Sequence, residues 1–493
     1  MTAVWAGLPL ALVLLLMIGW RWPAAYAGLA GLGSAAILAL TVFGFGTETH
    51  PGLGVSGVLA GSGLEALFTT ATILWIIFPA LAIYELQVRS GAFATIRRGL
   101  AALSDDSRIQ ALLVAWFFAL FMEGAAGFGT PVALAAPLLV SLGFSPIKAV
   151  TLALIGHAVG VSFGAVGTPV LAQSALTDLN ASGIAGETGL LHGILGMILV
   201  FFLVRLAGDG APSARQWMWA VLAGACFLIP YAVLAIAVGP ELPTLGGALL
   251  GGLCFAAFLR MRVQNSGSNS ALAVAKAGLP YGVILILILA TRLTPGLKEQ
   301  LRSIEVVWSL SGVFSGSLQP LYHPGAMLML GLVIGGLAQE LTPADLACAA
   351  KAALRRLSLV AVALVAMLGL SRIMLHAGMI QVLAEAAAGA WPLIAPTVGI
   401  LGTFVTGSAT ASNILFTEFQ AATASALALP LVTMTAAQGF GAAVGNIICP
   451  HNIIAGAATV GLSGQEGGVL TRTAVACAAY AFAGGALVLA LTS

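Results

Sequence analysis

The chain has 493 residues, of which 60% are hydrophobic and 7% are charged, and its formal net charge is +2. A soluble protein carries about 25% charged residues, so this chain cannot cover an aqueous surface. The composition therefore predicts an integral membrane protein. The scattering of basic residues among short loops predicts no nucleic-acid partner.

A helix that spans a membrane needs about 20 residues, and apolar segments of nearly that length recur along the whole chain. They predict an all-α polytopic membrane protein with about twelve transmembrane helices in a lipid bilayer. The predicted spans lie near residues 3–20, 24–44, 64–86, 149–176, 188–207, 216–238, 243–259, 278–294, 323–340, 357–376, 430–462 and 471–491. The first run lacks the basic start of a signal peptide, so we expect it to be retained. Residues 1–493 are expected to form one transporter domain, with no soluble domain attached.

Basic residues fall in alternate loops, and the positive-inside rule places such loops in the cytoplasm. The loops assigned to the cytoplasm carry Arg21, Arg89, Arg97, Arg98, Arg108, Arg205, Arg215, Arg260, Arg262, Lys276, Lys351, Arg355 and Arg356. This orientation requires residues 108–145 to enter and leave on the cytoplasmic side, and residues 391–428 to enter and leave outside. Both segments are therefore predicted to be re-entrant hairpins, and both termini external. The 292–305 loop is an exception, because its basic residues fall outside.

An internal repeat supports the hairpins independently. FMEGAAGFGT at 121–130 lines up with FVTGSATASN at 404–413, and HAVGVSFGAVGTP at 157–169 lines up with QGFGAAVGNIICP at 438–450. Each unit is predicted to be a hairpin followed by a span broken near a glycine and a proline. An odd number of spans between the hairpins inverts the second unit relative to the first.

The two repeat units, 108–176 and 391–462, indicate a secondary transporter, because inverted repeats with interrupted helices are typical of that class. Its binding site is expected near the membrane midplane, where the half-helix ends face one another. A second interpretation stays open for the small residues Gly156, Gly160 and Gly164, whose spacing also suits close helix packing.

Both hairpin bends carry groups suited to binding a small carboxylate. Backbone that leaves the helix at membrane depth must be satisfied by protein, water or ligand. In the second hairpin the candidate groups are Thr406, Gly407, Ser408, Thr410, Ser412 and Asn413, at the start of a returning half-helix whose N–H groups favour an anion. In the first hairpin they are Gly124, Gly127, Gly129 and Thr130, where glycine allows close approach of backbone to ligand.

Charged side chains inside apolar spans are costly and usually functional. Glu123, at the first bend, is a candidate proton-coupling group, because burial disfavours an ionised carboxylate; the alternative is a structural carboxylate that caps free N–H groups. His157 is a candidate proton relay, or a neutral histidine hydrogen-bonded within the bundle. Glu418, on the second returning half-helix, is a third proton-coupling candidate.

Arg372 lies near the end of its predicted span, in GLSRIMLHAGM. A guanidinium takes a carboxylate through two hydrogen bonds, so Arg372 is a candidate substrate-binding residue. The alternative is that the side chain extends to the outer membrane interface. His192 and His376, near span ends, are expected at the interface.

No Walker lysine loop, HExxH helix or GxSxG turn stands where it would work, which disfavours ATP-driven transport and enzymatic chemistry. We therefore expect no enzyme activity and no cofactor beyond a coupling ion. A carrier and a passive anion channel both remain open, because a channel would use the same hairpins as a filter.

Five blocks of the sequence resemble one known family. They are EGAAGFGTPVALAAPLLVSLGF, FGAVGTPV, SRIMLHAGM, TGSATASNILF and GNIICPHNIIAGAATVGL, spread over most of the chain. They are similar to the lactate permeases of bacterial plasma membranes, a family that includes glycolate permeases. The resemblance implies proton-coupled uptake of small 2-hydroxymonocarboxylates such as lactate and glycolate.

The chain departs from the family pattern at three positions. Ala409 stands where the family often has an acid, Asn446 where it often has a lysine, and Gln438 begins the second broken helix in a changed context. Joint loss of an acid and a base is consistent with a lost ion pair, with altered coupling or with another small carboxylate substrate.

Overall fold

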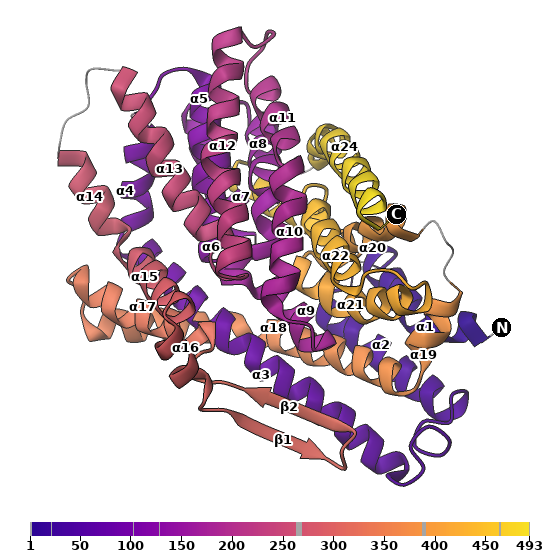
Figure 1. Ribbon diagram of the computed structural model, residues 1–493. Coiled ribbons are helices and arrows are strands. Elements are labelled where there is room, and N and C mark those ends of the chain that lie inside the picture. The colour runs from indigo at the N-terminus through magenta and orange to yellow at the C-terminus, as the bar shows by residue number, and fades with distance from the viewer. Residues whose placement is uncertain are drawn as a thin grey trace.

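A computed structural model describes residues 2–20, 22–101, 103–127, 129–262, 269–386, 391–462 and 465–492. Within these ranges the chain is helical apart from one β-hairpin (Figure 1). Arg21 lies outside the described residues, as do the side chains of Arg97 and Arg262. The prediction of a polytopic helical membrane protein is confirmed.

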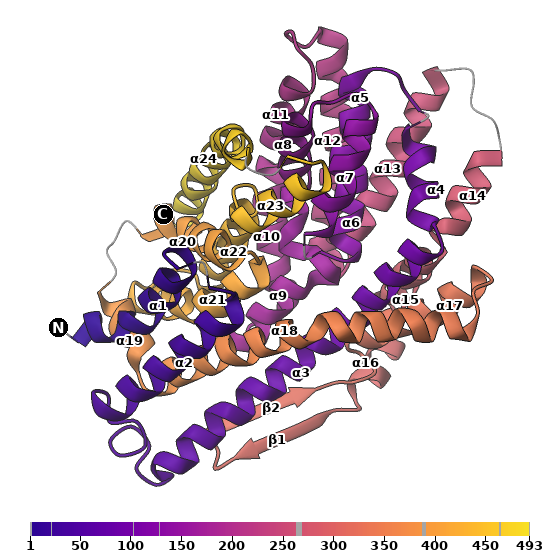
Figure 2. The same cartoon turned by 180° about the vertical axis from the view of Figure 1, so that it is seen from behind.

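Two long helices form the base of the molecule. α3 (Gly54–Arg89) and α18 (Pro343–His376) have 36 and 34 residues and lie side by side in both views (Figures 1 and 2). At 1.5 Å per residue each helix is about 50 Å long, which exceeds the thickness of the hydrocarbon layer, about 30 Å. α1 (Thr2–Ile18) packs on α2 (Ala24–Thr41), and α2 packs on α18.

The first repeat unit has the predicted hairpin and broken helix. The hairpin consists of α5 (Ser107–Ala111), the π-helical turn η1 (Leu112–Phe118), α6 (Ala119–Ala125) and α7 (Thr130–Ser141). The broken helix consists of α8 (Pro146–His157), the 3₁₀ segment η2 (Ala158–Phe163) and α9 (Gly164–Thr177). Residues 165–167 have positive φ inside α9, so the break coincides with the predicted GAVGTP segment.

The second unit repeats this pattern. α20 (Trp391–Thr406) and α21 (Ala409–Ala426) pack together as a hairpin. α22 (Leu431–Gly445) and α23 (Pro450–Thr459) form the broken helix, interrupted at residues 446–449. The first hairpin descends from the top of Figure 1, whereas α20 and α21 lie to the right, toward the chain termini.

The remaining helices surround these two units. They are α4 (Ala92–Ala101), α10 (Ala181–Leu195), α11 (Met197–Ala207), α12 (Ala214–Ala237), α13 (Pro243–Arg262), α14 (Asn269–Ala277), α15 (Leu279–Leu293), α16 (Pro295–Arg302), α17 (Pro324–Ala338), α19 (Met379–Glu385) and α24 (Glu466–Thr492). Among the described residues, eight helices are long and apolar enough to span a membrane, or up to eleven if each bent pair is one span. The expected twelve included α1 and α17, which are shorter apolar helices, whereas residues 107–125 of the first hairpin reach spanning length.

The sequence analysis missed a β-hairpin between α16 and α17. β1 (Val306–Leu310) pairs antiparallel with β2 (Phe314–Leu318). Three residues connect the strands, and the first two, Ser311 and Gly312, have positive φ. The fold class is confirmed apart from this hairpin. The alternation of polar and apolar residues in FSGSL, which is typical of a half-buried strand, was the available signal.

Several of the basic loops gather on one side of the structure. Nη2 of Arg108 donates to the carbonyl oxygen of Gly210 (2.5 Å), and Nζ of Lys148 lies 2.7 Å from the carboxylate of Asp209. One basic residue of the 292–305 loop has an acidic partner, because the Arg292 guanidinium lies 2.7 Å from Oε1 of Glu241. Both partners are buried, so Arg292 balances an acid and does not mark a cytoplasmic loop.

Candidate functional site

Both hairpin bends and both helix breaks meet at one small cavity of about 30 Å³. Its lining residues are Glu123, Gly127, Gly129, Val161, Gly164, Ala165, Pro169, Gly407, Ser408, Ala409, Thr410 and Asn446. Six of the predicted site residues therefore line one cavity, and His157 lies 3.9 Å from one of them, although the two bends are nearly 300 positions apart in the chain. Because a water needs about 10–15 Å³ of such space, this central cavity holds only one or two waters in the present conformation.

The first bend depends on two glycines. Gly127 and Gly129 have φ of 58° and 77°, and both line the central cavity. Thr130 begins α7, as predicted, and its hydroxyl donates to the carbonyl oxygen of Gly127 (2.8 Å). Gly124 has another role, because a Cβ there would lie 2.5 Å from the backbone nitrogen of Leu245 on α13. Gly124 therefore allows close helix packing and does not line the cavity.

The Glu123 carboxylate is buried and faces the central cavity. It accepts no hydrogen bond from any of the described residues, so the alternative of a structural N–H cap is not realised. Its nearest charged neighbour is His157, with Oε2 of Glu123 3.9 Å from Nε2 of the ring. Gly164 lies against Oε1 and leaves no room there for a side chain.

The hydrogen bonds of His157 are consistent with two protonation states. Nδ1 lies 2.6 Å from the carbonyl oxygen of Ala153, so Nδ1 carries a proton and donates. Nε2 lies 3.1 Å from Oδ1 of Asn446, which also accepts from Nδ2 of Asn452 (2.9 Å). A charged ring donates to Asn446 in this arrangement. A neutral ring accepts instead, once both amide groups are turned around. The protonation of His157 is therefore linked to the orientation of two amides.

The second bend exposes the start of α21 to the same cavity. Ser408 is the N-cap, and its Oγ accepts from the backbone N–H of Ala411 (3.3 Å). Gly407 provides the bend with φ of 77°, and Oγ1 of Thr406 accepts from the N–H of Ser408 (3.3 Å). Thr410 is buried, lines the cavity and forms no side-chain hydrogen bond within the described part of the chain. Its hydroxyl is free for a ligand.

Ser412 and Asn413, also predicted to bind substrate, are engaged within the protein. Oγ of Ser412 donates to the carbonyl oxygen of Gly399 in α20 (2.8 Å). Nδ2 of Asn413 donates to the carbonyl oxygen of Pro169 in the first broken helix (3.1 Å). Gln438 joins them, with Nε2 3.2 Å from Oγ of Ser412. These residues fix the second hairpin to both broken helices.

The sequence analysis did not select His451 and Asn452, at the start of α23. A Cβ at Gly407 would lie 3.0 Å from the His451 ring, and one at Gly129 would lie 3.1 Å from Oδ1 of Asn452. The first turn of α23 therefore contacts both hairpin bends. The available signal was the polar pair in CPHNI, directly after the second helix break.

Arg372 and Glu418 belong to a separate cluster. Nη1 of Arg372 donates to Oε1 of Glu418 (3.0 Å), and Ser371 donates to the same carboxylate. Nε of Arg372 also lies 3.7 Å from Oε2 of Glu65, which accepts from His376 (2.8 Å). Glu418 lies ten residues beyond Ser408, about 15 Å along α21, so neither charged residue lines the central cavity. Arg372 has carboxylate partners within the protein and does not extend freely to the interface.

His192 corrects a further expectation. It was expected at the membrane interface, but its side chain is fully buried. Nε2 lies 2.9 Å from Oγ of Ser162, and Nδ1 lies 2.7 Å from the hydroxyl of Tyr480. A residue near a predicted span end is thus part of the packed interior beside the first helix break.

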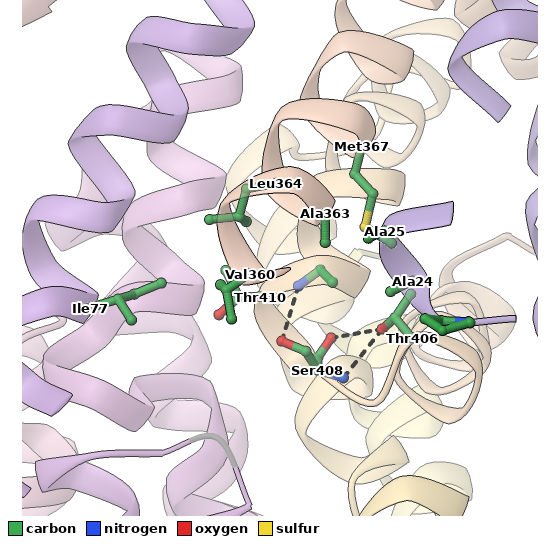
Figure 3. Close-up of a pocket in the computed structure, with 12 residues that line it drawn as sticks. Ala24, Ala25, Ile77, Val360, Ala363, Leu364, Met367, Thr406, Ser408 and Thr410 are labelled. Atoms are coloured by element: carbon green, nitrogen blue, oxygen red, sulfur yellow. Dashed lines mark hydrogen bonds between the residues drawn. The ribbon is translucent and has the colours of Figure 1, made fainter. Parts of the chain in front are cut away.

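A second and larger cavity of about 240 Å³ lies beside the second bend. We call it the apolar chamber. Its lining residues are Pro23, Ala24, Ala25, Ile77, Val360, Ala363, Leu364, Met367, Thr406, Ser408, Thr410 and Ala411 (Figure 3). Ser408 and Thr410 line both cavities, so the second bend separates them.

Comparison with known proteins decides the family. A sequence profile described as "L-lactate permease" matches residues 2–492. The chain belongs to the L-lactate permease family. It is 32% identical over 415 residues to an L-lactate permease of Streptococcus iniae, covering 80% of this chain and 85% of the relative.

Other members of the permease family match at similar levels. An L-lactate permease of Escherichia coli is 30% identical, with 80% of each chain covered. The glycolate permease GlcA of Escherichia coli is 28% identical, with 83% of this chain and 82% of the relative covered. Among solved structures, Neisseria gonorrhoeae MtrF matches with a TM-score of 0.47 and 15% identity, over 89% of this chain and 84% of that one.

Proposed function

We propose that this permease imports small 2-hydroxymonocarboxylates, such as lactate and glycolate, in symport with protons. The observation that carries the proposal is the central cavity, whose lining includes the buried carboxyl of Glu123 from the first hairpin and the hydroxyl of Thr410 from the second. The names of the lactate and glycolate relatives support this substrate class.

The start of α21 suits the carboxylate of the substrate. The first N–H groups of a helix have no partner inside the helix, and the helix dipole favours an anion there. Ser408 and Thr410 add hydroxyl donors on either side of Ala409. Because Ala409 replaces the acid common in the family, no carboxylate from that position repels the substrate.

The proton is carried by Glu123 and shared with His157. The substrate anion and the proton enter the same cavity, so one transport cycle moves both without separating charge. When His157 gains or loses a proton, Asn446 and Asn452 must turn to keep their hydrogen bonds. Asn452 contacts the first bend, and His451 beside it contacts the second. Protonation can thus change the packing of both bends.

The central cavity is narrow in this conformation. About 30 Å³ is too small for lactate, which has six non-hydrogen atoms, so the bends must separate before substrate enters. This is the behaviour expected of a carrier with alternating access, in which the site is never open to both sides.

Purified protein in liposomes tests the proposal. We expect accumulation of labelled lactate when the lumen is more alkaline than the medium, and loss of accumulation when a protonophore is added. Glycolate should compete with lactate. Uptake that only equilibrates lactate across the membrane, with no effect of the protonophore, would indicate a passive channel instead.

A further inference from the structure

The apolar chamber is larger than the proposed substrates require. It lies between α2, α3, α18 and the second hairpin, and its walls include Ile77, Leu364 and Met367 (Figure 3). A dry apolar cavity of about 150 Å³ accommodates benzene. The chamber of about 240 Å³ therefore has room for far more than the methyl group of lactate.

The chamber adjoins the place proposed for the substrate carboxylate. Thr410 lines both the chamber and the central cavity, is buried, and lacks a side-chain hydrogen bond to the described residues. Ser408 likewise lines both. A molecule whose polar end contacts these two hydroxyls on their chamber side can place an attached apolar group among the aliphatic walls.

The chamber walls also define the chemistry of that group. Among the described residues that line the chamber, none is charged, and its polar groups are the hydroxyls of the second bend. A protonated amino group would lose its water there without gaining an anionic partner, which is costly. An aliphatic or phenyl group instead gains from burial. The chamber therefore suits an acid whose tail is apolar and not one whose tail ends in an ammonium group.

We propose that the chamber binds the apolar 2-substituent of larger 2-hydroxymonocarboxylates, with 2-hydroxyisocaproate as the representative. This inference rests on the proposed function, because it uses the same site for the carboxylate. It extends the substrate class from lactate and glycolate to hydroxy acids with branched aliphatic or phenyl side chains. Each buried carbon adds affinity, and lactate and glycolate leave most of the chamber unused.

The test is counterflow of labelled lactate in proteoliposomes, with unlabelled acids as competitors. The three additional carbons of 2-hydroxyisocaproate should lower its half-inhibitory concentration at least about tenfold relative to unlabelled lactate. An acid of similar length whose tail ends in an ammonium group, 6-amino-2-hydroxyhexanoate, should not compete. Loading the liposomes with 2-hydroxyisocaproate should also drive lactate entry, which shows that the larger acid is transported.

Two variants fill the chamber from different helices. Ala363→Phe on α18 and Ala24→Leu on α2 both place carbon atoms in the chamber. Each should abolish the advantage of 2-hydroxyisocaproate while lactate counterflow continues. Val362→Phe is the matched control, because Val362 is the adjacent residue of α18 and is exposed on the outer surface. It should keep the tenfold preference. The second chamber variant keeps the test valid if the first one misfolds. Size-exclusion chromatography detects misfolding of either variant.

The outcomes separate this inference from the proposed function. Absence of lactate counterflow in the unmodified protein contradicts the proposed function itself. Normal lactate counterflow with inhibition by 2-hydroxyisocaproate no stronger than by lactate contradicts the chamber proposal alone. A preference for 2-hydroxyisocaproate over lactate that persists in both Ala363→Phe and Ala24→Leu also contradicts the chamber proposal. This result is expected if a lipid acyl chain occupies the chamber.

Discussion

The Glu123 carboxylate lies 3.9 Å from Nε2 of His157, across the gap between the first hairpin and the broken helix that follows it. No other charged side chain lines the central cavity among the described residues. The acid comes from α6 of the hairpin and the imidazole from the end of α8, so a movement of the hairpin changes their separation. In the proposed function, proton exchange and hairpin movement therefore occur at the same point of the structure.

The Arg372 cluster should contribute to stability. Arg372→Ala leaves the buried Glu418 carboxylate without its 3.0 Å guanidinium partner. Removal of one member of a buried ion pair costs about 3–5 kcal/mol, so a marked fall in the thermal unfolding temperature is expected. The double variant Arg372→Ala with Glu418→Gln should recover part of the loss. If Arg372→Ala instead keeps its unfolding temperature and loses lactate affinity, the arginine binds substrate in another conformation.

The hydroxyl of Thr410 should bind the substrate. Thr410→Val keeps the shape of the side chain and removes one hydrogen bond, which predicts a loss of about 1 kcal/mol in binding, or about fivefold in lactate affinity. Ser412→Ala is the control, because that hydroxyl already donates to Gly399 within the hairpin. We expect it to lower thermal stability and leave affinity nearly unchanged. Equal lactate affinity in Thr410→Val and the unmodified protein would exclude Thr410 as a ligand.

The sequence predicted those parts of the fold that leave a local signal. The aligned segments at 121–130 and 404–413 located both hairpins, and helix α7 begins at Thr130 as expected. Contacts between distant segments left no such signal. Glu418 was placed on the correct half-helix, but its partner Arg372 comes from α18, and Glu65, the second carboxylate beside Arg372, comes from α3. One sequence does not show that these helices meet there.

The sequence alone also does not distinguish a glycine that allows close helix packing from one that lines the binding site. Gly124 and Gly127 stand three positions apart in the same bend and look equivalent. Only the structure shows that Gly124 faces the backbone of Leu245, whereas Gly127 lines the central cavity. The role of a glycine is set by its neighbours on other helices, because it has no side chain to indicate one.

The orientation in the membrane can be tested with single cysteines in a variant without native cysteines. Asp105 and Ser182 are both exposed, in the loop before α5 and at the start of α10. The positive-inside pattern predicts that Asp105→Cys faces the cytoplasm and Ser182→Cys faces outside. An impermeant thiol reagent added to intact cells should therefore label only Ser182→Cys. Labelling of both positions, or of Asp105→Cys alone, would show that the predicted orientation is wrong.

Glu123→Gln should separate transport from proton coupling. Glutamine keeps the shape and hydrogen-bonding capacity of the side chain but cannot exchange a proton at the central cavity. We therefore expect the variant to lose lactate accumulation under a pH gradient, while exchange of internal for external lactate remains measurable. Glu85→Gln is the matched control, because Glu85 is also buried but pairs with Arg356 (3.0 Å) away from the cavity. It should retain accumulation. If Glu123→Gln concentrates lactate as well as the unmodified protein does, the coupled proton is carried by another group, and His157 is the next position to vary.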